Sequence, residues 1–227
     1  MGNRRAYYVN SEGPDHDAFR KTLAWTISQS TKSQESVTLV LNVKSNLAGV
    51  VGDVLGEEVR KTLEKGNSVR LPNNGGTLSV VTRKTMVRHR MTGIALVAYP
   101  SPDTLDVVDD TMGFTDVVVI PWLREEVVPW ISTWKADEIF GNPMKIKVEN
   151  IDPALKDALN RIHTTVNVST GISHPLDKKH AIRILKGLSL TGAKLSPDAT
   201  RSYLIGEKGW RPEDADDVVE IVKKLSK

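Results

Sequence analysis

Short segments that are almost wholly apolar alternate with amphipathic segments over the first 140 residues of the chain. Residues 37–43 and 94–99 are dense in valine, leucine and other apolar residues, the pattern of strands buried on both faces of a sheet. Residues 47–65 place apolar side chains at four-residue spacing, which predicts a helix. Residues 5–10 and 117–122 are predicted as further strands. Strands that alternate with helices indicate an α/β domain with a Rossmann-like, mostly parallel sheet flanked by helices.

Two segments depart from this alternation. Residues 68–85 hold two short apolar stretches around Asn73-Asn74-Gly75-Gly76, whose residue types favour turns, so we expect a strand pair or an irregular insertion there. The helix predicted over residues 127–134 contains Pro129. Because proline lacks an N–H donor, we expect it to be tolerated only near the first turn.

The pattern after Pro143 is almost entirely helical. Amphipathic segments follow one another, and each begins at a proline, a residue that suits the first turn of a helix. These prolines are Pro153, Pro175, Pro197 and Pro212. We therefore expect a Rossmann-like α/β domain of residues 1–141, followed by a small all-helical C-terminal domain of residues 142–227.

Composition narrows the class of protein. The 227 residues are 39% apolar and 26% charged, which is typical of a globular chain and excludes collagen-like and disordered classes. The absence of cysteine excludes disulfides, thiol catalysis and cysteine-ligated metal sites. No apolar run is long enough to span a bilayer and no signal peptide is visible, so we expect a cytoplasmic protein that does not enter membranes.

No catalytic or cofactor motif is recognisable. The chain has neither a Gly-Lys-Ser/Thr phosphate-binding loop nor a GxGxxG sequence after its first strand. Gly49, Gly52 and Gly56 either let backbone amides approach a phosphate or let a helix pack closely on the sheet. We assign no catalytic residue, and any cofactor is unknown.

Polar residues follow several predicted strands and mark a candidate ligand site. In parallel α/β sheets, ligands bind beyond the carboxyl ends of the strands, where the connections diverge. A polar edge with one base and two carboxylates suits a small phosphorylated or hydroxylated ligand. Helix capping is the alternative role for the serines. The predicted ligand-binding residues are Asn10, Ser11, Ser45, Asn46, Ser101 and Arg124.

Two clusters of potential metal ligands lead to no metal prediction. The first has the composition of an acidic, solvated helix face and consists of Asp103, Asp106, Asp109 and Asp110. The second turns progressively around a predicted helix instead of converging, and consists of His174, Asp177 and His180. We expect no metal site.

Basic residues gather in two places. The net charge is only +3, and residues 142–227 hold 15 basic and 11 acidic side chains, so we expect any nucleic-acid binding to be weak and salt-sensitive. A solvated strand edge, or the outer face of a packing or oligomerisation helix, has the same composition. The predicted nucleic-acid-binding residues are Arg83, Lys84, Arg88, Arg90, Lys178, Lys179, Arg183 and Lys186.

These patterns favour a non-catalytic protein that binds a ligand or partner at the carboxyl ends of its parallel strands. A nucleic-acid-binding protein that uses its helical domain is one alternative, and an enzyme acting on a nucleotide or phosphorylated metabolite is another. Homo-oligomerisation through the helical domain also stays open. Trp122, Trp130 and Trp134 are expected to pack in the core or between domains rather than to form a surface for base stacking.

Overall fold

The computed structural model describes residues 4–73, 75–87, 91–111, 113–146 and 150–226. The chain divides into two units. Residues up to 131 together with 135–145 form an α/β unit, and residues 132–134 with those from 146 onward form a helical unit. The expected change of domain at residues 141/142 lies close to this division. As a boundary between independently folding domains, it stays a prediction.

The α/β unit is built on a seven-stranded sheet with the order β3-β4-β2-β5-β6-β1-β7. Every neighbouring pair is parallel except β3 and β4. The strands are β1 (Arg5–Tyr8), β2 (Val37–Leu41), β3 (Val69–Arg70), β4 (Thr77–Thr82), β5 (Gly93–Ala98), β6 (Phe114–Ile120) and β7 (Asp137–Glu138). The predicted α/β class with a mostly parallel sheet is confirmed.

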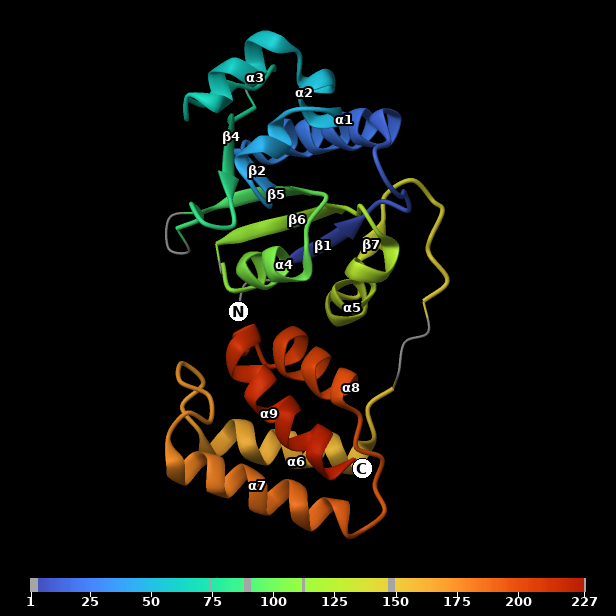
Figure 1. Ribbon diagram of the computed structural model, residues 1–227, viewed down its shortest axis with the longest axis vertical. Helices are drawn as coiled ribbons and strands as arrows, with labels where there is room; N and C mark the ends of the chain where they lie inside the picture. The colour runs from blue at the N-terminus through green and yellow to red at the C-terminus, as the bar shows by residue number, and fades with distance from the viewer. Residues whose placement is uncertain (1–3, 74, 88–90, 112, 147–149, 227) are drawn as a thin grey trace. The chain divides into compact units, whose positions relative to one another are not determined.

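Helices cover both faces of this sheet (Figure 1). One face carries α1 (His16–Ser33), α2 (Val50–Leu55) and α3 (Glu57–Glu64), and the other carries α4 (Pro102–Asp109) and α5 (Arg124–Trp134). Each residue of β2 and β5 is buried, because these central strands are covered on both sides. This is why their sequences are apolar apart from Thr38 of β2.

Three local features differ from the expectations. The single helix expected over residues 47–65 is divided into a 3-10 turn (Lys44–Leu47), α2 and α3, because Gly56 adopts a φ of 81° that no α-helix accommodates. Pro129 lies inside α5 rather than near its first turn, so that expectation was wrong. The irregular segment forms the antiparallel pair of β3 and β4, one of the two expected arrangements.

The helical unit contains α6 (Pro153–Thr165), α7 (Pro175–Ser189), α8 (Pro197–Ser202) with a π-helical turn (Tyr203–Glu207), and α9 (Pro212–Leu225). The four expected proline starts are confirmed. The apolar stripes of these helices meet in one core, in which Leu159, Ile162, Leu185, Leu204 and Val218 are fully buried. Within the described ranges, none of the helices is both long and apolar enough to cross a lipid bilayer.

Candidate functional site

The order of the strands creates a point of divergence between β1 and β6. These strands are parallel neighbours. The chain leaves β1 towards α1 on one face of the sheet, and leaves β6 towards α5 on the opposite face (Figure 1). Neighbouring connections that part in this way leave room for a ligand beyond the carboxyl ends of the strands. The β1–β6 edge is therefore where the topology places a candidate site.

Buried polar atoms without partners lie at this edge of the sheet. Ser11, three residues beyond the last residue of β1, is 7% exposed, and its Oγ has no hydrogen-bond partner in the part of the chain that the structure describes. The same holds for Oδ1 of Asn10 and for the hydroxyl of Tyr99. A buried polar group left unpaired costs about 1–3 kcal/mol of folding free energy. Binding of a ligand that supplies the missing hydrogen-bond partners is therefore favoured here.

Tyr99 occupies a strained backbone position. Its φ is 55°, in the left-handed region that bulky residues rarely adopt. Two hydrogen bonds hold the Tyr99 backbone there. Its N–H donates to the carbonyl of Ile120 at 2.8 Å, and its carbonyl accepts from the side-chain Nδ2 of Asn42 at 2.9 Å. The ends of β5, β6 and β2 are thereby joined around this one residue.

Aromatic contacts orient the Tyr99 side chain. Its ring stacks on Phe19 of α1 at 6.4 Å between ring centroids, and meets Trp122 edge-on at 5.5 Å. Trp130 is 4% exposed and lies in the core, whereas Trp122 is 44% exposed and does not. Trp122 follows the last strand residue of β6 closely, at the edge where the sheet ends.

The hydroxyls at this edge are hydrogen-bond donors at neutral pH. Burial, with the nearby carboxylate of Asp15 as a smaller cause, raises the pKa of Tyr99 to about 12. The phenol therefore stays protonated. Together with the hydroxyl of Ser11, it offers donors to an acceptor oxygen such as those of phosphate or carboxylate groups.

The two diverging loops are tied to each other. The N–H of Gly13 donates to the carbonyl of Trp122 at 2.8 Å. Nη1 of Arg124, at the start of α5, lies 3.8 Å from Oε2 of Glu12, and both side chains are about half exposed. Such an exposed ion pair is weak, so an incoming anion competes for the guanidinium at little cost.

A second divergence separates β2 from β5, and the other predicted ligand residues lie there. Oδ1 of Asn42 accepts from the N–H of Ser101 at 2.9 Å and from the Thr104 hydroxyl at 2.6 Å. Oδ1 of Asn46 accepts from the N–H of Val43, which stabilises the turn after β2, and Ser45 is exposed on the same turn.

The six predicted ligand residues therefore form two groups. Asn10, Ser11 and Arg124 lie at the ends of β1 and β6, whereas Ser45, Asn46 and Ser101 follow β2 and β5. The alternative of helix capping is not observed at Ser101, whose side chain does not cap α4. The sequence interpretation missed Tyr99 and Asn42, although each directly follows an apolar strand, because both were assigned to the strands themselves.

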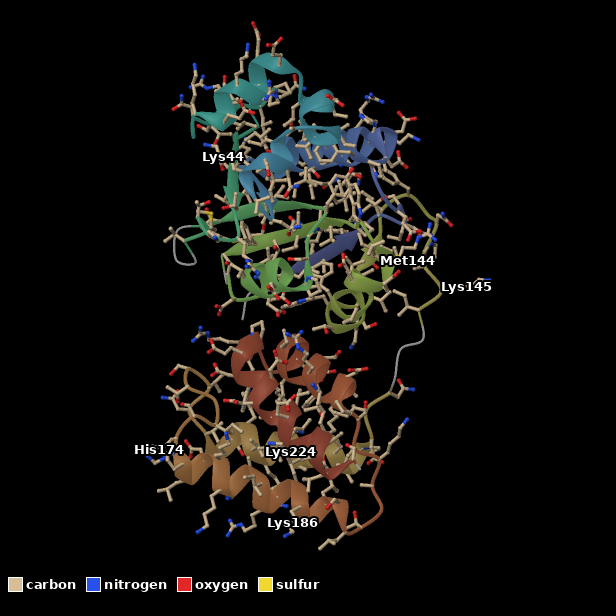
Figure 2. All side chains as sticks on the ribbon, in the orientation of Figure 1. Lys44, Met144, Lys145, His174, Lys186 and Lys224 are labelled. Atoms are coloured by element: carbon tan, nitrogen blue, oxygen red, sulfur yellow. The ribbon has the colours of Figure 1, made fainter. Side chains whose placement is uncertain are left out.

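The basic residues are distributed differently in the two units. The guanidinium of Arg83 pairs with the carboxylate of Asp103, while Lys84 is exposed. Arg88 and Arg90 lie outside the described residues. The remaining predicted nucleic-acid-binding residues lie on α7 and are all exposed: Lys178, Lys179, Arg183 and Lys186. Figure 2 shows Lys186 on the outer side of this helix. Their nucleic-acid role stays a prediction.

The acidic cluster of α4 is engaged in structural contacts. Asp109 accepts from Nη1 of Arg4 at 3.3 Å and from Nε1 of Trp130 at 2.9 Å. In the second cluster, Nδ1 of His174 accepts from the N–H of Leu176 and caps α7. Across the described ranges, no group of three or more His, Cys, Asp or Glu side chains is placed to hold a metal ion.

Comparison with known proteins adds one finding. A family model described as a domain of unknown function, DUF1889, matches residues 151–227, which comprise α6 to α9. Neither the curated proteins nor the solved structures contain a match to the chain. The family match covers the helical region and no part of the α/β unit, so the candidate site at the sheet edge has to be argued from its own chemistry.

Proposed function

We propose that the α/β unit binds a small phosphorylated ligand at the carboxyl ends of β1 and β6, as a binding protein rather than as an enzyme. The observation that carries this proposal is that two buried hydroxyls, of Ser11 after β1 and of Tyr99 after β5, have no hydrogen-bond partner among the described residues. Folding leaves both groups unsatisfied at a cost that a bound acceptor oxygen removes.

The surroundings of the hydroxyls support an anionic ligand. Arg124 supplies a guanidinium held by only a long ion pair, at 3.8 Å. The residue before it, Leu123, has no side-chain acceptor for the first N–H groups of α5, which remain available to an anion. The loop carboxylates of Glu12 and Asp15 repel a ligand that carries several negative charges, so a ligand with a single phosphate is favoured.

The chemistry of the hydroxyls favours binding over catalysis. A phenol whose pKa is raised to about 12 donates a hydrogen bond and does not abstract protons at neutral pH. Ser11 has no partner among the described residues that would act as its base. Turnover of a bound compound by the purified protein would replace this proposal with the enzyme alternative.

A thermal-shift screen of nucleoside monophosphates, sugar phosphates and inorganic phosphate tests the proposal. A ligand present at about a hundred times its dissociation constant adds about 2.7 kcal/mol to the free energy of unfolding. Ser11→Ala and Tyr99→Phe are expected to abolish the shift. Ser33→Ala, at an exposed position on α1, and Tyr7→Phe, on β1, are the matched controls and should retain it.

Two results would defeat the proposal. The first is the absence of a shift with every compound of the screen. The second is a shift that survives both Ser11→Ala and Tyr99→Phe, because the ligand would then bind elsewhere on the protein.

A further inference from the structure

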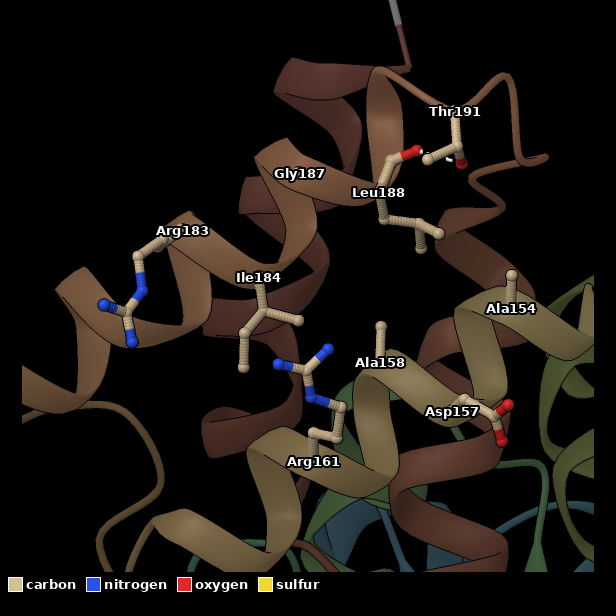
Figure 3. A pocket seen from close by; sticks show the side chains of 9 residues that line it. All are labelled: Ala154, Asp157, Ala158, Arg161, Arg183, Ile184, Gly187, Leu188 and Thr191. Carbon is tan, nitrogen blue, oxygen red and sulfur yellow. Dashed lines mark hydrogen bonds between the residues drawn. The ribbon is translucent and has the colours of Figure 1, made fainter.

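An open groove runs between α6 and α7 of the helical unit. Its volume is about 440 Å³, and its floor is formed by small and apolar side chains, including Ala158, Ile184 and Leu188. Figure 3 shows Arg161 extending from α6 towards α7, with Arg183 at the same end of the groove. The groove is thus apolar along its floor and cationic at one end.

Gly187 lines this groove at a position where the fold does not require glycine. It lies inside α7, where glycine is the least favourable residue apart from proline. A Cβ at this position would meet no atom within 4 Å, and its φ is not among the positive values. Neither packing within the described chain nor backbone geometry explains the residue. Close approach of another backbone to this side of α7 does explain it.

The charge of the groove selects an acidic occupant. Arg161 and Arg183 are exposed, and neither forms an ion pair in the ranges that the structure describes, although Nη2 of Arg183 lies 2.9 Å from Nδ1 of His180. Lys179 and Lys186 are also exposed, and their spacing places them along the same side of α7 as Arg183. Asp157 is the acidic residue of the lining. Two copies of this face would repel each other, which disfavours a symmetric dimer through it.

Exposed apolar side chains at the two ends of α7 favour a helix over a nucleic acid. Leu176, in the first turn of α7, is 69% exposed, and Leu190, directly after the helix, is 82% exposed. Phosphate backbones gain nothing from such side chains, whereas the apolar stripe of an amphipathic helix buries them. The antiparallel pair of α6 and α7 presents its lining at helical spacing, which a third helix matches.

We propose that the groove between α6 and α7 docks an amphipathic α-helix of a partner protein, with an apolar stripe on the groove floor and carboxylates beside Arg161 and Arg183. Such a helix buries the exposed apolar residues and lies against Gly187. This docking site is independent of the ligand site proposed for the α/β unit, and either proposal survives failure of the other.

A displayed library of amphipathic helices of about 18 residues tests the preference. One face is randomised among Ala, Leu, Ile and Met, and the flanking positions among Glu, Lys and Gln. Selection on the full-length protein should enrich Glu at the flanks. A selected peptide is then synthesised, and its affinity for the protein and for each variant is measured by fluorescence anisotropy.

Two variants and one control localise the interaction. The double variant Arg161→Glu and Arg183→Glu should lower the affinity for the selected peptide by at least about tenfold. Gly187→Leu should abolish binding by filling the groove, and it should remain folded because leucine favours helix. Lys21→Glu with Lys32→Glu changes the net charge equally on exposed positions of α1, and should leave the affinity within about twofold.

Four results would overturn the proposal. The first is selection of basic helices or of none, and the second is equal binding of the peptide by the arginine variant and by its lysine control. The third is unimpaired binding by Gly187→Leu. The fourth is duplex DNA that binds more tightly than the peptide at physiological salt and depends on Arg161 and Arg183 for its binding. The last result would make the groove face a nucleic-acid surface. A fifth result, self-association that Gly187→Leu removes, would also overturn the proposal, because a second copy of the chain would then be the occupant.

Discussion

The indole N–H of Trp210 donates a hydrogen bond to Nδ1 of His163 across 3.0 Å, inside the helical unit. Trp210 is 2% exposed and belongs to the apolar core of this unit. Acceptance by Nδ1 requires a neutral imidazole that carries its proton on Nε2. The contact therefore connects the packing of the core to the protonation of one histidine.

This relationship predicts a loss of stability in mild acid. Burial, and to a lesser extent the charge of Lys208, lower the pKa of His163 below its ordinary value of 6.5. The unfolded chain then binds the proton first, so the contribution is fully present above about pH 6.5 and is lost as the pH falls towards the folded pKa and below. Urea unfolding, followed by tryptophan fluorescence from about pH 8 to pH 5, measures it. A His163→Gln variant with an unchanged pH profile would refute the assignment.

Removal of the unsatisfied hydroxyls should stabilise the ligand-free protein. Ser11→Ala and Tyr99→Phe eliminate buried groups for which the described residues offer no partner, so each should raise the free energy of unfolding by up to about 1 kcal/mol. Thr104→Val is the contrast, because the Thr104 hydroxyl is buried and donates to Asn42, and it should lower stability by about 1 kcal/mol. Chemical denaturation measures all three, and destabilisation by Ser11→Ala would show that its hydroxyl has a partner.

Asn42 should be required for the conformation of Tyr99. Asn42→Ala removes one donated and two accepted hydrogen bonds and is expected to cost about 2–3 kcal/mol of folding free energy, together with loss of any ligand shift. Asn42→Asp keeps the acceptor for Ser101 and Thr104 but loses the donor to Tyr99, so it should cost less stability. Equal losses in the two variants would argue against the role of the donated bond.

Gly187→Ala should stabilise the helical unit. Alanine is about 1 kcal/mol more favourable than glycine inside a helix, and the new Cβ meets nothing within 4 Å. Gly171→Ala is the opposite case, since Gly171 has a φ of 54° and its Cβ would lie 2.7 Å from Cβ of Asp214. Thermal unfolding of the two variants should shift in opposite directions. A destabilised Gly187→Ala protein would show that the glycine serves the fold itself.

Limited proteolysis should cleave first between about residues 141 and 151. The division of the chain at residues 145/146 falls in this range, so the expected products are an α/β fragment and a helical fragment, identified by mass spectrometry. Resistance of this segment while other loops are cut would contradict the predicted boundary.

The class of the fold was predictable because strands that are buried on both faces of a sheet have a recognisable apolar sequence. A central strand such as β2 is covered on both faces, so apolar residues fill it except at Thr38, and this pattern is visible without knowledge of its neighbours. The helices of the C-terminal region were predictable for a similar reason, since each combines a first-turn proline with an apolar stripe. Asn10, Ser11 and Arg124 could be nominated from the general rule that parallel strands bind ligands at their carboxyl ends.

The order of the strands was decided only by tertiary structure. Nothing local to residues 5–8 specifies that β1 lies between β6 and β7, and β7 itself is a two-residue strand without an apolar pattern. That order makes the connections after β1 and β6 diverge, and joins Tyr99 to Ile120 and Trp122. The left-handed backbone of Tyr99 and the facing of Arg161 with Arg183 likewise depend on contacts between distant segments. Local propensity and periodicity describe how a segment is buried, whereas the partner that buries it is chosen by packing across the whole chain.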